Sequence, residues 1–246
     1  MLSMKLLLVR HAEPDYEHDS ITEKGRREAA FLSQRLARIP AKAYYVSPLG
    51  RAKDTAAPTL KAVGGTAVEC PWLREFHAPI RRPDVLGHKM ITWDWLPQDW
   101  TADERFFRDD QWYQVQTMVG GGVKAEYDWV TGELDALLEH YGYRRDGRCY
   151  RALAPNNDVI ILFCHFGVTG VLLSHLLNVS PMVLWHGSCA APSSVTTVVT
   201  EERREGTAYF RMLEFGDISH LYANGEAPSF AARFRECYTN GWERLD

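Results

Sequence analysis

Two short apolar runs stand out along the chain, and each is followed directly by a histidine. The first, Lys5–Arg10, ends in an arginine and precedes His11, and the second, Asp158–Cys164, precedes His165. Apolar runs of this length predict strands that are buried on both faces, as parallel strands are. In open α/β sheets, ligands bind at the carboxyl ends of such strands. If the two strands are neighbours, both imidazoles meet at one edge of the sheet.

The pattern after the first run predicts alternating helices and strands. Ser20 and Glu23 have the spacing of a capping box, which marks the start of a helix. Pro58 falls inside a helical pattern, where we expect a kink or an early break. The other expected elements of this part are a helix over 29–39, a strand at Ala43–Val46, a helix over 52–63 and a strand at Thr66–Cys70. This order implies parallel strands with right-handed crossovers.

The carboxyl-terminal half completes an α/β pattern. It predicts a helix over 123–141, a polar loop over 143–157, a helix after residue 167, strands at 195–200 and 208–215, and a short helix over about 230–238. We therefore expect a three-layer α/β/α fold with a mostly parallel central sheet. A chain of 246 residues is long enough for one large domain of this class.

The segment from about residue 80 to residue 122 interrupts this pattern. Prolines, charges and aromatic residues are mixed there without strand alternation. Five of the eight tryptophans lie in or just beyond it: Trp93, Trp95, Trp100, Trp112 and Trp129. We expect an inserted, largely helical cap over the site, within a single domain of residues 1–246. The tryptophans are expected to form the small core of this insertion, with direct ligand contact as the alternative.

Composition narrows the class of protein. Hydrophobic residues make up 46% of the chain and charged residues 24%, as in ordinary globular proteins. The net charge of −4 argues against a nucleic-acid-binding surface. The five cysteines are scattered without CxxC spacing, so we expect neither disulfides nor structural zinc, and a cytoplasmic location. No apolar run is long enough to span a membrane, and no pattern specifies an oligomeric state.

Four side chains expected at one edge of the sheet suit a phosphorylated ligand: Arg10, His11, Arg51 and His165. A guanidinium group offers a planar fork to phosphate oxygens, and an imidazole can act as nucleophile, acid or base near neutral pH. Backbone N–H groups at the start of the helix containing Gly167 would add an anion site. Taken singly, Arg51 could be a solvated helix residue and His165 a core histidine. Together, the four favour a phosphoryl group.

These residues lie in blocks that resemble the histidine phosphatase superfamily, which contains cofactor-dependent phosphoglycerate mutases and many small phosphatases. The blocks are Arg10-His11-Ala12, Thr22–Gly25, Ser47-Pro48 through Arg51-Ala52 to Thr55-Ala56, Leu73–Glu75 and Cys164–Gly167, with Asp217–Leu221 as a further similar segment. The resemblance covers residues 4 to about 221, apart from the aromatic insertion. It implies a phosphoglycerate mutase-like fold.

The resemblance also implies a mechanism with a phosphohistidine intermediate. His11 would be the nucleophile that attacks phosphorus in line, and water would later hydrolyse the phosphoenzyme. Arg10, Arg51 and His165, with the backbone at Gly167, would bind the oxygens of the transferred phosphoryl group, where charge must be balanced in the transition state.

A carboxylic acid completes the implied mechanism. Glu75 would donate a proton to the leaving alcohol and then act as the base for water. Glu69 and Asp84 are alternatives by position along the chain, and the family block favours Glu75. The arginines and histidines supply the positive charge, so we expect neither a metal ion nor a cofactor.

One departure from the family pattern bears on the substrate. The mutases and sugar-bisphosphate phosphatases carry a serine and an asparagine three and six residues after the nucleophilic histidine, where this chain has Pro14 and Glu17. This difference favours a phosphatase acting on a small-molecule phosphate monoester over a mutase. The alternatives are a mutase-type phosphoryl transfer, a protein phosphohistidine or phosphotyrosine phosphatase, and a non-catalytic phosphate-binding protein.

Overall fold

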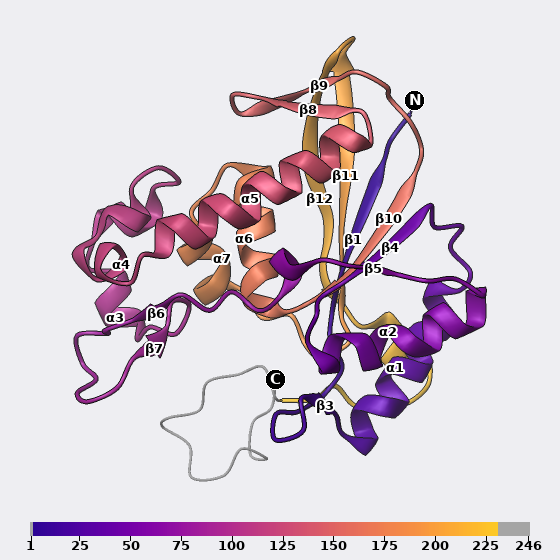
Figure 1. Ribbon diagram of the computed structural model, residues 1–246, viewed down its shortest axis with the longest axis horizontal. Helices are drawn as coiled ribbons and strands as arrows, with labels where there is room; N and C mark the ends of the chain where they lie inside the picture. Colours follow the sequence, from indigo (N-terminus) through magenta and orange to yellow (C-terminus); the bar gives the residue numbers. More distant parts are fainter. Residues whose placement is uncertain (1, 231–246) are drawn as a thin grey trace.

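The computed structural model describes residues 2–230 of the chain, and its centre is an eight-stranded sheet with helices on both faces (Figure 1). The order of the strands is β5 (Val68–Glu69), β4 (Ala43–Val46), β10 (Val159–Cys164), β1 (Lys5–Arg10), β11 (Val195–Arg204), β12 (Thr207–Asp217), β9 (Cys149–Ala152) and β8 (Tyr143–Asp146). The terminal helix expected over about 230–238 lies outside the described residues, apart from Phe230.

The two strands that precede the histidines are neighbours. β1 pairs with β10 in parallel, and Arg10 lies opposite Cys164. The half of the sheet from β5 to β1 is parallel, whereas the half from β11 to β8 is antiparallel. The sheet is therefore mixed, and its parallel half carries the ends from which a site can be built.

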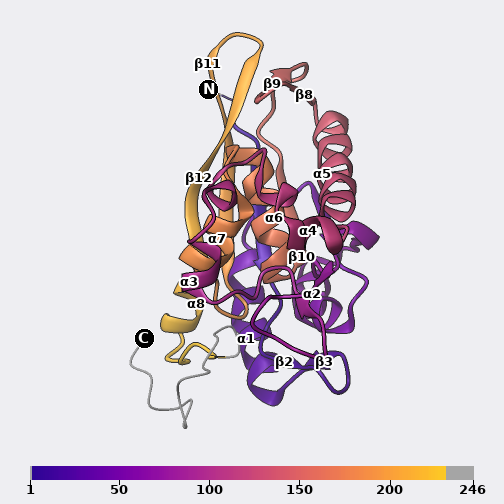
Figure 2. The ribbon, with the colours of Figure 1, turned by 90° about the vertical axis from the view of Figure 1, so that its left-hand side faces the viewer.

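Helices cover both faces because side chains of one strand alternate between two apolar clusters. Leu7 and Val9 of β1 pack on the face that is covered by α1 (Glu23–Leu36) and α2 (Gly50–Val63). Leu6 and Leu8 pack on the opposite face, under α5 (Val123–His140) and α6 (Phe166–Leu177). The expected α/β/α layers are confirmed. In Figure 2 the hairpin of β11 and β12 extends at the end of the sheet opposite α1.

The insertion consists of short elements with a common aromatic core. They are β6 (Pro79–Ile80), β7 (Met90–Ile91), α3 (Pro97–Trp100), η2 (Glu104–Phe107), η3 (Trp112–Gln114) and α4 (Gln116–Gly120). Trp95, Trp100 and Trp112 are buried in the apolar cluster that also covers one face of the sheet. Trp112 meets Trp185 of α7 (Pro181–Gly187) with ring centroids 5.7 Å apart. The expectation that tryptophans form the core of the insertion is thus confirmed for these three residues.

Three local expectations need correction. The N-cap of α1 is Thr22, whose hydroxyl accepts a hydrogen bond from Gly25, whereas Ser20 lies in the short strand β3 (Ser20–Ile21). No early break occurs at Pro58, since α2 continues to Val63. The segment expected as a polar loop contains the hairpin of β8 and β9, in which one side chain of each strand is buried, Tyr143 and Tyr150. The remaining short elements are β2 (Pro14–Asp15), η1 (Pro71–Leu73) and α8 (Ser219–Tyr222).

Two helical glycines provide a matched test of the packing on α6. A Cβ at Gly170 would lie 2.3 Å from Nε1 of the buried Trp185, whereas a Cβ at Gly132 on α5 would meet nothing within 4 Å. We expect Gly170→Ala to lower the free energy of unfolding by about 1–3 kcal/mol through overpacking. Gly132→Ala should raise it by about 0.5–1 kcal/mol through helix propensity. Urea denaturation measures both, and equal effects of the two substitutions would contradict this packing.

Candidate active site

The carboxyl ends of β1 and β10 bring the predicted side chains together. Arg10 ends β1, His11 follows it, and His165 follows β10 as the N-cap of α6. The rings of His11 and His165 have centroids 5.1 Å apart. Arg51 lies in the first turn of α2, which follows β4, and it acts electrostatically on both histidines. The expected convergence of these four side chains is therefore present in the structure.

The ring of His11 is held in one orientation and one tautomer. Nδ1 lies 2.8 Å from the carbonyl oxygen of Ala12. A carbonyl only accepts hydrogen bonds, so Nδ1 carries the proton and Nε2 carries the lone pair. Burial lowers the pKa of His11 well below its ordinary value, and Arg10 and Arg51 lower it further. At neutral pH this imidazole is uncharged and has a nucleophilic nitrogen.

The second histidine is also uncharged. Nε2 of His165 lies 2.7 Å from the hydroxyl of Ser47, at the end of β4. Burial lowers the pKa of His165 well below its ordinary value, with contributions from His11 and the two arginines. Nδ1 of His165 is buried and has no hydrogen-bond partner among the described residues. This nitrogen can meet an oxygen of a bound phosphoryl group.

A loop from the carboxyl-terminal half holds the backbone and side chain of the first strand end. Nη1 of Arg10 donates to the carbonyl oxygen of Ala190 at 2.5 Å. Ser193 donates its backbone N–H to the carbonyl of His11 at 3.0 Å, and has a positive φ of 61°. The Ser193 hydroxyl lies 3.0 Å from Nε2 of the buried His220. The segment that contains Ala190 and Ser193 thus reaches the site.

Arg51 is fixed by the loop that follows β2. Its Nη1 donates to Oδ1 of Asp19 at 2.6 Å, and Oδ2 of Asp19 accepts from the N–H of Gly50 at 2.7 Å. A Cβ at residue 50 would lie 2.1 Å from the carbonyl oxygen of Asp19, so the close approach requires glycine. The guanidinium also lies 5.5 Å from the ring centroid of the exposed Tyr16.

Glu75, in the loop after η1, lies at the start of α6. Its Oε1 accepts from the N–H of Val168 at 3.0 Å and from the N–H of Phe76 at 2.9 Å. Burial raises the pKa of Glu75, and the bond from Val168 and the charge of Arg10 oppose this rise. The anion at this helix N-terminus is therefore the chain's own carboxylate, whereas the sequence suggested the substrate's phosphoryl group. The direct binding of substrate by the backbone at Gly167 stays a prediction.

The two rivals of Glu75 lie in other surroundings. Glu69 is in β5 and pairs with Lys53 at the surface. Asp84 pairs with the buried Arg82, which also binds Asp94 and ties the β6–β7 hairpin to the following segment. Both carboxylates thus form ion pairs that account for their positions in the structure. Glu75 is the one of the three that interacts electrostatically with Arg10.

Sequence reasoning missed the partners that hold the site from a distance. Glu28 of α1 is fully buried, and its Oε2 accepts from the backbone N–H of Glu13 at 2.8 Å. Ser193 holds the backbone of His11, and His220 holds the hydroxyl of Ser193. Glu28 falls on the buried face of an amphipathic helix, where an acidic residue is unusual. An acidic residue on the buried face of this helix is the feature by which the sequence could have revealed the role of Glu28.

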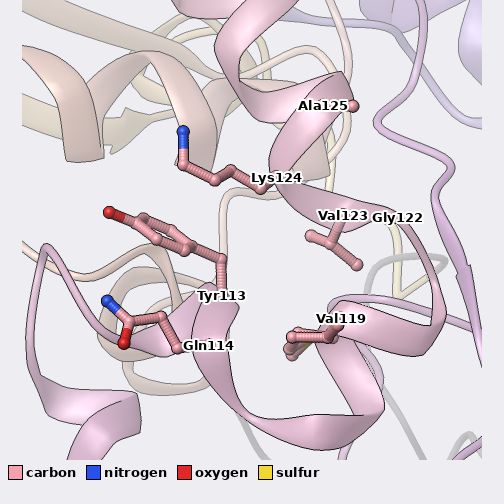
Figure 3. Close-up of a pocket in the computed structure, with 8 residues that line it drawn as sticks. Tyr113, Gln114, Val119, Gly122, Val123, Lys124 and Ala125 are labelled. Carbon is pink, nitrogen blue, oxygen red and sulfur yellow. The ribbon is translucent and has the colours of Figure 1, made fainter.

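Other cavities lie away from these residues. A cavity of about 480 Å³ is formed at the junction of η3, α4 and the start of α5, and its lining is mainly apolar (Figure 3). The lining residues are Tyr113, Gln114, Met118, Val119, Gly122, Val123, Lys124 and Ala125. None of the predicted site residues is among them.

Within residues 2–230, no group of three or more His, Cys, Asp or Glu side chains is arranged to hold a metal ion. The same residues contain no helix long and apolar enough to cross a membrane.

Comparisons with known proteins agree with this architecture. The family model of the histidine phosphatase superfamily (branch 1) matches residues 6–114. A probable phosphoglycerate mutase, GpmB of Cronobacter sakazakii, is 28% identical over 149 residues, which cover 56% of this chain and 69% of the relative.

Solved structures of phosphatases share the fold. The mycobacterial glucosyl-3-phosphoglycerate phosphatase is 18% identical, with a TM-score of 0.53, over 87% of this chain and 99% of that one. A phosphoserine phosphatase mutant of Entamoeba histolytica in complex with phosphoserine is 17% identical, with a TM-score of 0.55, over 89% and 99%. The matched family and these neighbours support an enzyme of the phosphatase or mutase type. Residues 6–114 thus match the histidine phosphatase superfamily, and the described chain has a fold similar to that of these solved phosphatases.

The buried Glu28 makes stability depend on pH. Burial raises its pKa from 4.5 to about 7, so between these values the folded state binds a proton that the unfolded state has released. The free energy of unfolding therefore falls as pH rises through this window. We expect Glu28→Gln to remove this fall and to stabilise the protein at pH 8 by up to about 3 kcal/mol relative to its effect at pH 5.

Urea denaturation at the two pH values measures this difference. Glu133→Gln, on the exposed face of α5, is the matched control and should leave the pH dependence of the wild type in place. If Glu28→Gln retained the full wild-type dependence, the buried carboxyl would not be its source.

Proposed function

We propose that this protein is a phosphatase that hydrolyses a small-molecule phosphate monoester through a covalent phosphohistidine on His11. The observation that carries the proposal is the state of that imidazole. Its Nδ1 donates to Ala12 and its pKa is lowered, so Nε2 has a free electron pair beside two guanidinium groups. A binding protein needs the cations, but it needs neither this nucleophile nor an adjacent acid.

In the first half-reaction, Nε2 of His11 attacks phosphorus and the bond from phosphorus to the ester oxygen breaks. Glu75 gives its proton to that oxygen, and the alcohol leaves. The raised pKa of Glu75 keeps a larger fraction of the carboxyl protonated near neutral pH. In the second half-reaction, Glu75 takes a proton from water, the resulting hydroxide attacks phosphorus, and neutral His11 is restored with release of phosphate.

Charge on the transferred group is balanced by the chain itself. Arg10 and Arg51 lie around the two histidines, and Nδ1 of His165 adds a polar contact. Electrostatic stabilisation at fixed positions is the main contribution expected for phosphoryl transfer. Hence we propose a reaction without a metal ion or cofactor, which hydrolysis of p-nitrophenyl phosphate in excess chelator tests. We also propose a cytoplasmic location, supported by the scattered cysteines.

Mutase-type transfer is the second candidate because the curated relative is a probable phosphoglycerate mutase. Two residues weigh against it. Pro14 is buried in β2 and has no hydrogen-bonding side chain, and the exposed Glu17 would repel an anionic sugar acid. The remaining alternative, a protein phosphohistidine or phosphotyrosine phosphatase, is tested by including phosphopeptides in a substrate panel.

The covalent intermediate can be trapped. Rapid quenching of the wild type with a labelled monoester should give an acid-labile, alkali-stable phosphoenzyme, as expected of phosphohistidine. His11→Ala should abolish labelling and lower turnover by more than about 1,000-fold, since removal of a nucleophile has effects of this size. The exposed His140 provides a matched control, and His140→Ala should leave both unchanged. Labelling that survives in His11→Ala would show that another residue is the nucleophile.

The role of Glu75 can be tested by varying the leaving group. p-Nitrophenolate leaves without a proton, whereas an alkoxide does not. We expect Glu75→Gln to lower kcat/KM by about 100-fold or more for an alkyl phosphate, and by only a few-fold for p-nitrophenyl phosphate. Because wild-type Glu75 must be protonated, its rate with alkyl phosphates should fall as pH rises through the raised pKa. Glu69→Gln is the control, and equal losses on both substrates in Glu75→Gln would contradict general acid catalysis.

A further inference from the structure

An aromatic surface adjoins the acid at the entrance to α6. Trp93, just after β7, is partly buried, and its Nε1 donates to the carbonyl of Phe76 at 3.0 Å. Its ring meets Phe166 edge to face, with centroids 5.8 Å apart and an interplanar angle of 79°. The insertion is therefore anchored through Trp93 to the first turn of α6.

The position of Trp93 relative to Glu75 follows from the space around Gly167. A Cβ placed at this residue would lie 2.4 Å from Nε1 of Trp93 and 2.7 Å from Oε1 of Glu75. The indole and the carboxylate thus contact the same small patch of backbone. In the proposed reaction the leaving oxygen must come within hydrogen-bond distance of the Glu75 carboxyl. The group attached to that oxygen then lies beside Trp93.

Phe166 continues this surface to the phosphate-binding side. It follows His165 directly, and Cζ of Arg10 lies 5.8 Å from its ring centroid. The ring of Tyr16 faces Arg51, and this tyrosine is 65% exposed. The path from the phosphoryl group to the leaving group is therefore bordered by aromatic rings.

Among the described residues, the cation that acts on Glu75 is Arg10. In the described part of the chain, the cations that act on His11 and His165 are Arg10 and Arg51. In the proposed reaction both bind the transferred phosphoryl group, and Arg51 also forms an ion pair with Asp19. A carboxylate or second phosphate on the leaving group would meet Trp93 and Glu75 instead.

We propose that Trp93 and Phe166 form the leaving-group subsite, and that the substrates are phosphate monoesters of alcohols whose hydroxyl adjoins an uncharged apolar ring. This inference rests on the proposed phosphatase function and specifies its substrate class. Trp93 is the specificity-determining residue, because it comes from the insertion and borders the acid, whereas Phe166 is largely enclosed by the fold.

The test compares benzyl phosphate with ethyl phosphate, whose leaving alcohols have similar acidity, and with phosphoserine as a charged leaving group. For the wild type we expect kcat/KM to be about tenfold or more higher for benzyl than for ethyl phosphate, as burial of part of a ring allows. Phosphoserine should be the poorest of the three. Equal rates for benzyl and ethyl phosphate, or faster hydrolysis of phosphoserine, would overturn the inference.

Variants separate specificity from a structural role. Trp93→Ala should remove the preference for benzyl phosphate while changing kcat/KM for ethyl phosphate by less than about threefold, since the apolar contact is made only with the ring. Trp93→Phe loses the indole N–H but keeps an aromatic surface, so it should retain most of the preference. Trp129→Ala is the matched control, because Trp129 lies on α5 against Arg74.

The outcomes distinguish the proposed leaving-group subsite from the proposed phosphatase function on which it rests. Equal loss on benzyl and ethyl phosphate in Trp93→Ala would show a structural role and overturn the subsite. Hydrolysis and phosphoenzyme formation without any ring preference would overturn the subsite and leave the phosphatase function standing. Absence of both hydrolysis and phosphoenzyme with every monoester would overturn the phosphatase function, and the subsite with it.

Discussion

The parallel pairing of β1 with β10 is the constraint on which the site depends. The register sets Arg10 opposite Cys164, so the two residues that follow, His11 and His165, leave the sheet side by side. A slip of one residue would turn each side chain to the opposite face. Such a slip is opposed by both apolar clusters at once, because Leu6 and Leu8 fill one and Leu7 and Val9 fill the other. The packing of the core and the geometry of the candidate site therefore have the same cause.

The register concentrates positive charge in a buried place, and the chain offsets it only in part. Both imidazoles remain uncharged, because burial and the neighbouring guanidiniums lower their pKa values. Arg10 has the carbonyl of Ala190 as an acceptor, and Arg51 has Asp19. The Nε atoms of both arginines are buried without a hydrogen-bond partner among the described residues. A phosphoryl dianion would supply the missing acceptors, which is why the arrangement favours this ligand over a neutral one.

The sequence predicts this architecture where local pattern and tertiary environment agree. The strands at β1 and β10 are apolar on both faces, and the long helix α5 has a regular buried face, so each was recognisable. The hairpin of β8 and β9 was not, because an edge position buries few of its side chains. The site residues likewise divide into those that the sequence pattern predicts and those that it does not. Residues at strand ends, such as His11 and His165, follow from position. Ser193, in contrast, meets His11 from a segment 182 residues further along the chain, and no local pattern encodes such a contact.

The placement of Glu75 at a helix N-terminus suits its proposed role as proton donor and acceptor. A carboxyl group that donates a proton in one step and accepts one in the next must not be held strongly in either form. Hydrogen bonds from Val168 and Phe76 favour the carboxylate, and burial favours the protonated acid. Trp93 approaches the same backbone, since a Cβ at Gly167 would lie 2.4 Å from its Nε1 and 2.7 Å from Oε1 of Glu75. In the proposed reaction, proton transfer through Glu75 and selection of the leaving group through Trp93 therefore depend on different side chains that meet at the backbone of Gly167.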